Sequence, residues 1–264
     1  MLIFVQYMSN LVRMTNKPTD TIASLLKGLQ VLECFDGQTA RLTISDVAGQ
    51  TGFDRATARR CLLTLHHGGY ANYDGKFFSL TPRALRLGLG ALSAMPLPQI
   101  VQPWLDQLAE QIGQSCSVSI LDGTEIIYIA RAAQKRVMSI GLMPGSRLPA
   151  HCTSMGRVLL ASLPAEQARA VLDASDLSPR TPRTLSDPDT IMERLAQIRA
   201  DGYSVNDQEI EMGLRSLAVP LVDAKNRTVA ALNTGMAAAE DPSTLVRDFL
   251  PPLLSVQTGL SRIL

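Results

Sequence analysis

The chain has 264 residues, of which 46% are hydrophobic and 19% charged, and no segment is repeated or of low complexity. These values are typical of a globular protein, exclude a low-complexity chain, and allow one large domain or two of medium size. The net charge of +1 hides an asymmetry: residues 1–95 hold 10 Lys and Arg against 6 Asp and Glu, whereas residues 96–264 hold 15 against 18. A basic amino-terminal part suits an anionic polymer as partner.

The first residues and the cysteines both indicate a cytoplasmic protein. Met1 to Tyr7 is apolar but too short to cross a bilayer, and it lacks the basic start and cleavage site of a secretory signal. We expect residues 1–20 to form a flexible arm, in which Met8 and Met14 are alternative starts. The cysteines show no Cys-x-x-Cys spacing and are expected to be reduced thiols: Cys34, Cys61, Cys116 and Cys152.

Residues 43–66 predict two short helices joined by a tight turn at Gly52. Each helix has apolar side chains at helical spacing on one face: Ile44, Val47 and Ala48 on the first, and Ala58, Cys61, Leu62 and Leu65 on the second. Asp54 is placed to cap the second helix. An earlier helix is expected at 21–34. This is the pattern of a helix-turn-helix, whose second helix enters a DNA major groove.

A β-hairpin is expected directly after the second helix, because Asp74-Gly75 separates two aromatic-rich runs. Such a hairpin forms a wing, so residues 21–81 predict a winged helix-turn-helix. The residues expected to contact DNA lie on the outer face of the second helix and on the wing: Arg55, Thr57, Arg59, Arg60, Thr64 and Lys76. Arginine suits both guanine edges and phosphates. The alternative, solvated charges on an exposed face, is disfavoured by the presence of both motifs.

Residues 82–95 are expected to form a linker helix, which the Pro96-Leu-Pro98 segment ends near Ala94, and residues 96–264 a second domain. The expected helices there are 99–112, 153–163, 165–172, 189–201 and 243–264. The expected strands are 115–121, 125–132, 137–142, 203–206, 216–222 and 228–234, and 145–151 is expected to be a loop. Strands flanked by helices predict an α+β domain with one mixed or antiparallel sheet.

The helix predicted at 153–163 begins with residues suited to an anion. A helix start exposes unpaired N–H groups and the positive end of the dipole, and Thr153 and Ser154 add hydroxyls there. This predicts a carboxylate site; the alternative is that Thr153 serves only as a cap. Arg131, at the end of the strand 125–132, is suited to pairing with an acid group, or is a surface residue.

Three segments together resemble the IclR family of bacterial transcription regulators, and the resemblance extends from Thr21 to Leu264. They are the helix-turn-helix and wing ending in Phe78-Ser-Leu-Thr-Pro-Arg-Ala-Leu-Arg-Leu-Gly88, the segment Pro144-Gly-Ser-Arg-Leu-Pro-Ala-His-Cys-Thr-Ser-Met-Gly-Arg157, and the segment Asp207-Gln-Glu-Ile-Glu-Met-Gly-Leu-Arg-Ser-Leu-Ala-Val-Pro220. The run from His151 to Arg157 is most similar to the branch that controls aromatic-acid breakdown through the β-ketoadipate route.

The resemblance implies a winged helix-turn-helix, a linker helix and a GAF-like effector domain, assembled as dimers or tetramers on operator DNA. It implies a small organic acid as effector, such as a hydroxybenzoate, protocatechuate or β-ketoadipate, and it places Ser154, Met155, Ser216 and Asn233 in the effector pocket. Some relatives have smaller residues at the positions of Ser154 and Met155, which bears on pocket volume. The predicted function is regulation of a catabolic operon, without catalysis or cofactor. The alternatives are an enzyme acting on a small acid, with an accessory DNA-binding part, and an architectural DNA-binding protein without ligand.

Four other motifs are set aside. Adjacent His151 and Cys152 rarely face one another, and no third group orients them. The pair His66-His67 lacks ligand spacing to a cysteine, so no zinc site is predicted. The Gly88-Leu-Gly90 run lies in a predicted helix, which argues against a dinucleotide loop. Glu209 and Glu211 are interpreted as part of a solvated loop, with metal binding as the alternative.

Overall fold

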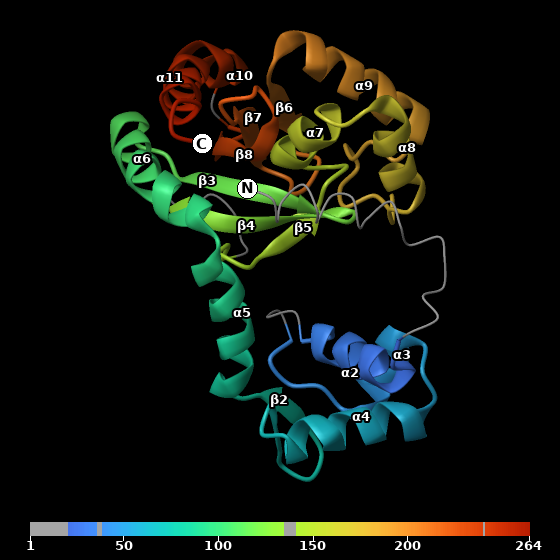
Figure 1. The fold of residues 1–264 in the computed structure, drawn as a ribbon. Coiled ribbons are helices and arrows are strands. Elements are labelled where there is room, and N and C mark those ends of the chain that lie inside the picture. The colour runs from blue at the N-terminus through green and yellow to red at the C-terminus, as the bar shows by residue number, and fades with distance from the viewer. Residues whose placement is uncertain (1–20, 36–38, 135–140, 240) are drawn as a thin grey trace. The chain divides into compact units, whose positions relative to one another are not determined.

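The computed structural model describes residues 21–35, 39–134, 141–239 and 241–264. The chain divides into two compact units, Met1–Ala94 and Met95–Leu264, each drawn with its elements in Figure 1. The predicted arm at 1–20 lies outside the described residues, as does most of the strand expected at 137–142. No helix in the described ranges combines the length and apolar character needed to cross a bilayer.

The first unit contains four helices and a two-stranded sheet among its described residues: α2 (Ala23–Glu33), α3 (Ile44–Thr51), α4 (Arg55–His67), β1 (Ala71–Tyr73), β2 (Phe78–Leu80) and α5 (Pro82–Ala94). Local capping sets the helix-turn-helix. The Thr43 hydroxyl accepts the N–H of Asp46, whose carboxylate accepts the N–H of Thr43. Gly52 ends α3 at a φ of 69°, a conformation that glycine adopts without strain, and Asp54 caps α4.

The predicted hairpin forms β1 and β2, which pair antiparallel and place Tyr73 opposite Phe78. The Asp74 carboxylate accepts the backbone N–H groups of Lys76 and Phe77, which fixes the turn. Phe78 is fully buried and also pairs with Leu42 across an isolated bridge, so the hairpin is anchored in the core of the unit. That core consists of Val31, Leu42, Val47, Ala58, Leu62, Ala71 and Phe78.

The second unit is built on a six-stranded antiparallel sheet in the order β5-β4-β3-β8-β7-β6. Its strands are β3 (Cys116–Asp122), β4 (Glu125–Ala132), β5 (Arg147–Pro149), β6 (Ser204–Asp207), β7 (Leu214–Val222) and β8 (Thr228–Ala237). The helices are α6 (Pro96–Ile112), α7 (Ser154–Ala161), α8 (Ala165–Asp173), α9 (Pro188–Asp201), α10 (Pro242–Thr244) and α11 (Leu250–Leu260).

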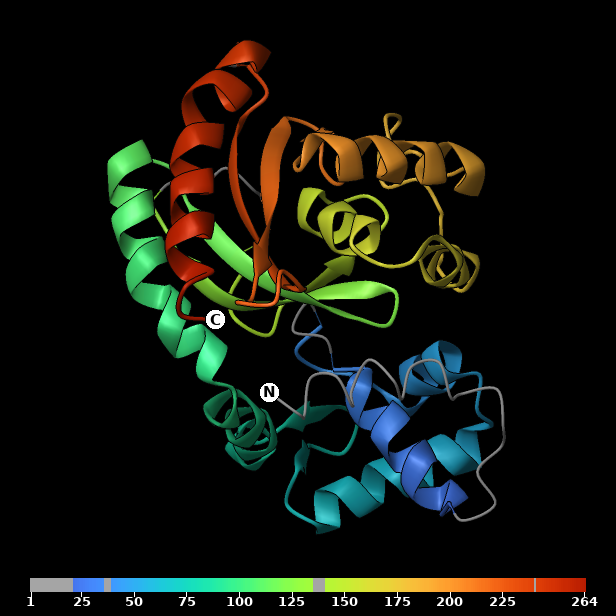
Figure 2. The ribbon, with the colours of Figure 1, turned by 45° about the horizontal axis from the view of Figure 1, so that its top comes forward.

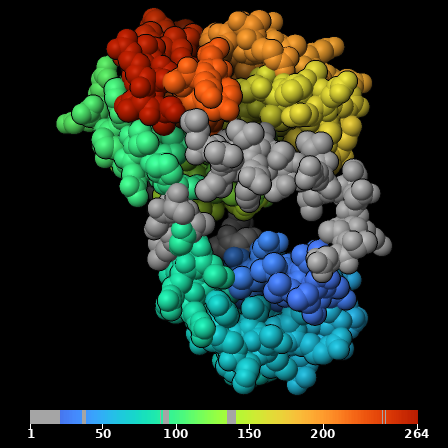
Figure 3. Space-filling view, viewed as in Figure 1, coloured from blue at the N-terminus to red at the C-terminus, as the bar shows by residue number. Residues whose placement is uncertain are grey.

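Helices cover both faces of this sheet. Apolar residues of α6 and α11 pack on one face, and residues of α7, α8 and α9 pack on the other. In Figure 3 the atoms of α6 (green) and α11 (red) lie next to one another. Figure 2 shows the two groups on opposite sides of the strands. The α+β architecture predicted from the sequence is therefore confirmed.

Three expectations about individual elements are wrong. The loop expected at 145–151 contains β5, which extends the sheet beside β4. The single closing helix expected at 243–264 is divided into α10, a π-helical turn at Leu245–Phe249 and α11. Pro251 and Pro252 lack N–H groups and are accommodated in the first turn of α11, where no intrahelical donor is needed. The helix expected at 99–112 begins earlier, at Pro96 (α6), because a proline is also tolerated in the first turn of a helix.

Candidate functional site

Helix α4 presents a row of cations on its outer face. Arg59 and Arg60 are exposed in the middle of the helix, and Arg59 makes no hydrogen bond or ion pair with any residue that the structure describes. Arg55 is exposed in the first turn and donates to Ser45 Oγ at 2.7 Å, which links α4 to α3. These three side chains are therefore placed to meet phosphates or base edges if α4 enters a major groove.

The two threonines predicted on the same surface have structural roles. Thr57 is 7% exposed, its N–H and hydroxyl both donate to the Asp54 carboxylate, and it belongs to the helix cap. Thr64 is exposed, but its hydroxyl donates to the backbone oxygen of Arg60. The hydrogen bonds from Thr57 lower the pKa of Asp54, so this cap stays ionised at neutral pH.

Two cations lie at the wing, and the sequence analysis missed one of them, Arg41, which packs against the hairpin from outside it. Lys76 is exposed and lies 5.0 Å from the centre of the Phe77 ring. Arg41 packs on the same ring, at 4.7 Å, and forms an ion pair with Asp74. Arg41 precedes the Leu42 bridge to β2, a pairing that no local sequence pattern indicates.

In the second unit, all six residues predicted to bind the effector line one pocket between α7 and the sheet: Arg131, Thr153, Ser154, Met155, Ser216 and Asn233. Seven further residues that the sequence analysis did not single out complete the lining: Ser115, Tyr128, Leu142, Leu148, Ile210, Leu214 and Gly235. The polar groups come from the start of α7, from Ser115 just before β3, and from strands β4, β7 and β8, whereas much of the rest is apolar. Such a lining suits a small molecule with one acidic end.

A β-bulge brings two of these side chains to the same face of the sheet. In β4, Arg131 pairs with Ser117 and Ala130 with Val118, but Tyr128 already pairs with Ser119, so Ile129 is the extra residue. Without the bulge, Tyr128 and Arg131 would point to opposite faces, because side chains alternate along a strand. The bulge therefore places both against α7.

Hydrogen bonds order the polar wall of the pocket. The Ser216 hydroxyl donates to Ser154 Oγ at 2.9 Å, and the Ser119 hydroxyl donates to Met155 Sδ at 3.2 Å. Thr153 caps α7, since its hydroxyl accepts the N–H of Gly156 and donates to the backbone oxygen of Pro149. The cap uses one first-turn N–H group, and those of Ser154 and Met155 remain without an intrahelical acceptor.

Arg131 is half-buried and donates to Ser117 Oγ at 2.9 Å, and no carboxylate among the described residues pairs with it. Tyr128, nearby, is 4% exposed, and burial raises the pKa of its phenol, which is therefore neutral at physiological pH. The pocket thus combines a cation that has no anion in the described structure with a neutral hydroxyl. This combination complements a hydroxylated acid.

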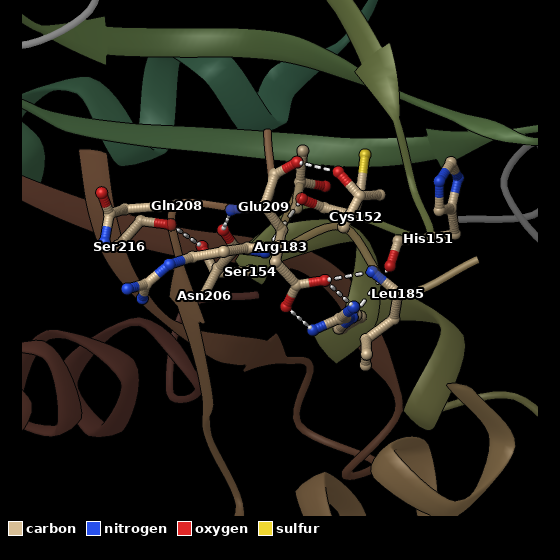
Figure 4. Close-up of polar contacts among 12 residues, drawn as sticks. His151, Cys152, Ser154, Arg183, Leu185, Asn206, Gln208, Glu209 and Ser216 are labelled. Atoms are coloured by element: carbon tan, nitrogen blue, oxygen red, sulfur yellow. Dashed lines mark hydrogen bonds and ion pairs between the residues drawn. The ribbon is translucent and has the colours of Figure 1, made fainter. Parts of the chain in front are cut away.

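A buried ion pair lies behind the start of α7, and it corrects the interpretation of Glu209 as part of a solvated loop. The side chains of Arg157 and Glu209 are 1% and 10% exposed, and two N–H···O bonds of 2.5 Å join the guanidinium to the carboxylate. Figure 4 shows the polar contacts of Glu209 with its neighbours, including the Leu185 N–H. The sequence alone did not reveal this burial, because the partner is 52 residues away.

The residues of the motifs set aside in the sequence lie in surroundings that the structure describes individually. Burial raises the pKa of the Cys152 thiol to about 11, which leaves it un-ionised, and burial with the neighbouring Arg157 lowers the pKa of His151. His66 Nδ1 lies 2.9 Å from the backbone oxygen of Ala71, a structural contact. No three His, Cys, Asp or Glu side chains within the described ranges gather as metal ligands.

Comparison with known proteins identifies both parts of the chain. The IclR helix-turn-helix domain matches residues 24–75, and the bacterial transcriptional regulator IclR C-terminal domain matches residues 89–241. The chain belongs to the IclR family. It is a DNA-binding transcriptional regulator and not an enzyme, since the family and the similar proteins are regulators.

Similar proteins place this IclR-family chain near regulators of aromatic catabolism. It is 43% identical over 243 residues to the Pca regulon regulatory protein of Pseudomonas putida, covering 91% of this chain and 84% of the relative. It is 37% identical to the p-hydroxybenzoate hydroxylase transcriptional activator of Acinetobacter baylyi, with 92% of both covered. A double mutant of the PobR inducer binding domain from Acinetobacter, in complex with 3-hydroxybenzoic acid, is 32% identical, with a TM-score of 0.60 over 63% of this chain and 98% of that chain.

Proposed function

We propose that this regulator controls an operon for aromatic-acid catabolism and that the pocket between α7 and the sheet binds the inducing acid. The observation that carries this proposal is the pocket itself, in which Arg131 has no carboxylate partner among the described residues and two hydroxyls lie beside a helix start. The effector class is a hydroxybenzoate, protocatechuate or β-ketoadipate. The names of the Pca and p-hydroxybenzoate regulators and the 3-hydroxybenzoic acid complex of the relative support this class.

Each pocket group has an assigned role. The Arg131 guanidinium pairs with the effector carboxylate, which is a charge-assisted contact and so among the stronger hydrogen bonds. The N–H groups of Ser154 and Met155 face negative charge at the positive end of α7. Asn233 and Ser216 bind a second polar group, while the apolar side chains exclude an acid of the wrong shape. Met155, in contact with Ser119, limits the depth of the pocket.

DNA recognition is assigned to α4 and the wing. Arg59 and Arg60 bind bases or phosphates in the major groove, Arg55 binds the backbone near the helix start, and Lys76 reaches the flanking phosphate or minor groove. Residues 21–81 form the DNA-binding domain, 82–95 the linker and 96–264 the effector domain of a cytoplasmic dimer or tetramer. Effector binding shifts the placement of paired reading domains and so their fit to two half-sites.

Two titrations test the proposal. Calorimetry with 4-hydroxybenzoate, protocatechuate and β-ketoadipate should show saturable binding of at least one acid, with no product formed on incubation. Gel-shift titration on promoter fragments of the genes beside the regulator gene should show a complex whose affinity changes with that acid. Binding of DNA with no response to any acid would favour an architectural protein and contradict the effector assignment.

A further inference from the structure

The Arg157–Glu209 pair connects two walls of the pocket without lining it. Arg157 is one helical turn after Ser154 on α7, and both side chains therefore point to neighbouring parts of one helix face. Glu209 follows β6 and immediately precedes Ile210, which lines the pocket together with Leu214 further along the chain. The ion pair thus joins the segment that carries Thr153–Met155 to the segment that carries Ile210–Ser216.

Additional bonds hold both ends of the pair. Arg157 Nε donates to the backbone oxygen of His151 at 2.8 Å, and the Glu209 carboxylate accepts the Leu185 N–H at 3.0 Å. Asn206 ties the same two segments together, since its side chain donates to the Cys152 oxygen at 2.9 Å and accepts the Glu209 N–H at 3.3 Å. Figure 4 shows the contacts of Asn206 and Glu209 with their neighbours. A buried charge pair with its remaining groups bonded fixes direction as well as distance.

We infer that Arg157 and Glu209 are positioning residues. Their bidentate ion pair holds the start of α7 at the distance from Ile210–Ser216 that the effector requires. This inference rests on the proposed function of the pocket. An apolar contact at the same place would bury a similar surface but would leave the two segments free to slide, because hydrophobic contact is non-directional. A planar guanidinium bonded to both oxygens of one carboxylate does not allow that sliding.

The test separates positioning from stability by removing both charges at once. Arg157→Met with Glu209→Gln leaves no unpaired buried charge and keeps an acceptor for the Leu185 N–H, so the protein should still fold. Binding of 4-hydroxybenzoate, protocatechuate and β-ketoadipate is measured by calorimetry well below the unfolding temperature of each variant. The matched control is Arg169→Met with Asp173→Asn, which by the same kind of substitution removes the exposed ion pairs of Arg169 with Asp173 and with Asp189.

We expect the Kd of the acid that the parent binds to rise about tenfold in the buried double variant and to stay unchanged in the control. Arg157→Lys is a second variant: it keeps the charge but loses the planar fork, and its affinity should fall as well. Parent-like affinity in either the double variant or Arg157→Lys would overturn the inference.

Hydrogen exchange of backbone amides in the ligand-free protein tests the positioning role without any effector, and so separately from the proposed function. The N–H groups of Gly156 and Leu214 are hydrogen-bonded on the two walls, to Thr153 Oγ1 and to the Glu211 oxygen. Both should exchange faster in the buried double variant and not in the exposed control. If the parent binds none of the three acids, the proposed function fails, while unchanged exchange at both amides would refute the positioning role by itself.

Discussion

Replacement of Gly156 by alanine tests how closely α7 approaches the preceding loop. A Cβ at this position would lie 2.2 Å from the backbone oxygen of Ala150 and 2.4 Å from its Cα. A normal carbon–oxygen contact is about 3.3 Å, so helix and loop must separate by roughly 1 Å. Since the obstacle is backbone and every residue of α7 is buried, no flexible side chain can move aside.

The expected cost follows from two opposing effects. Overpacking of a tight site lowers the free energy of unfolding by about 1–3 kcal/mol or more. The better helix propensity of alanine raises it by about 1 kcal/mol at most. We therefore expect a net loss of about 2 kcal/mol in the free energy of unfolding. For a unit of this size, that corresponds to a fall in unfolding temperature of about 4–8 °C. Because Ser154 and Met155 lie in the same turn, effector affinity should fall as well.

Scanning calorimetry of the full chain measures the effect, and Gly49→Ala is the matched control. Gly49 is also a helical glycine, in α3, but its new Cβ would meet nothing within 4 Å. This substitution should raise stability by about 0.5–1 kcal/mol. If Gly156→Ala unfolds at the temperature of the parent or above it, the close approach of α7 to Ala150 does not constrain the fold and the reasoning is wrong.

Three further substitutions test the proposed DNA contact of Arg60, the proposed role of Arg131 in the pocket, and the loss of stability at low pH. Arg60→Ala should weaken operator binding by about 1–3 kcal/mol in a gel-shift titration and leave thermal unfolding unchanged, since Arg60 is exposed; unchanged affinity would remove it from the interface. Arg131→Met should weaken binding of the aromatic acid about thirtyfold, from a Coulomb contribution of about 2 kcal/mol for a half-buried pair, and should hardly affect the neutral methyl ester. An equal loss for acid and ester would contradict the assigned pairing. The Arg227 side chain holds the pKa of Asp223 at about 2, below its ordinary value of 3.8, so Asp223 stabilises the fold above pH 3.8 and less as pH falls towards 2. In urea unfolding from pH 6 to 2.5, the free energy of unfolding of Asp223→Asn should fall less with pH than that of the parent. An equally steep fall would refute the role of Asp223.

The helix-turn-helix could be predicted because its determinants are local. The cap at Asp54, the turn at Gly52 and the hairpin at Asp74 each act over a few residues, and the structure shows all three. Most helices and strands of the second unit were also predicted, because apolar spacing reports the face that each element buries. Pairings over longer distances left no such pattern, and β5 and the Leu42 bridge were therefore missed.

The sequence by itself determined two parts, a row of cations on the outer face of α4 and a pocket wall at the start of α7, because caps, turns and periodic apolar faces depend on near neighbours. Only the tertiary structure decided which distant groups meet. The bulge at Ile129 turns Tyr128 and Arg131 to one face, and burial converts Glu209 from an expected loop charge into the partner of Arg157. Both depend on contacts between segments far apart in the chain, and the energy of a charge depends on whether those contacts exclude water.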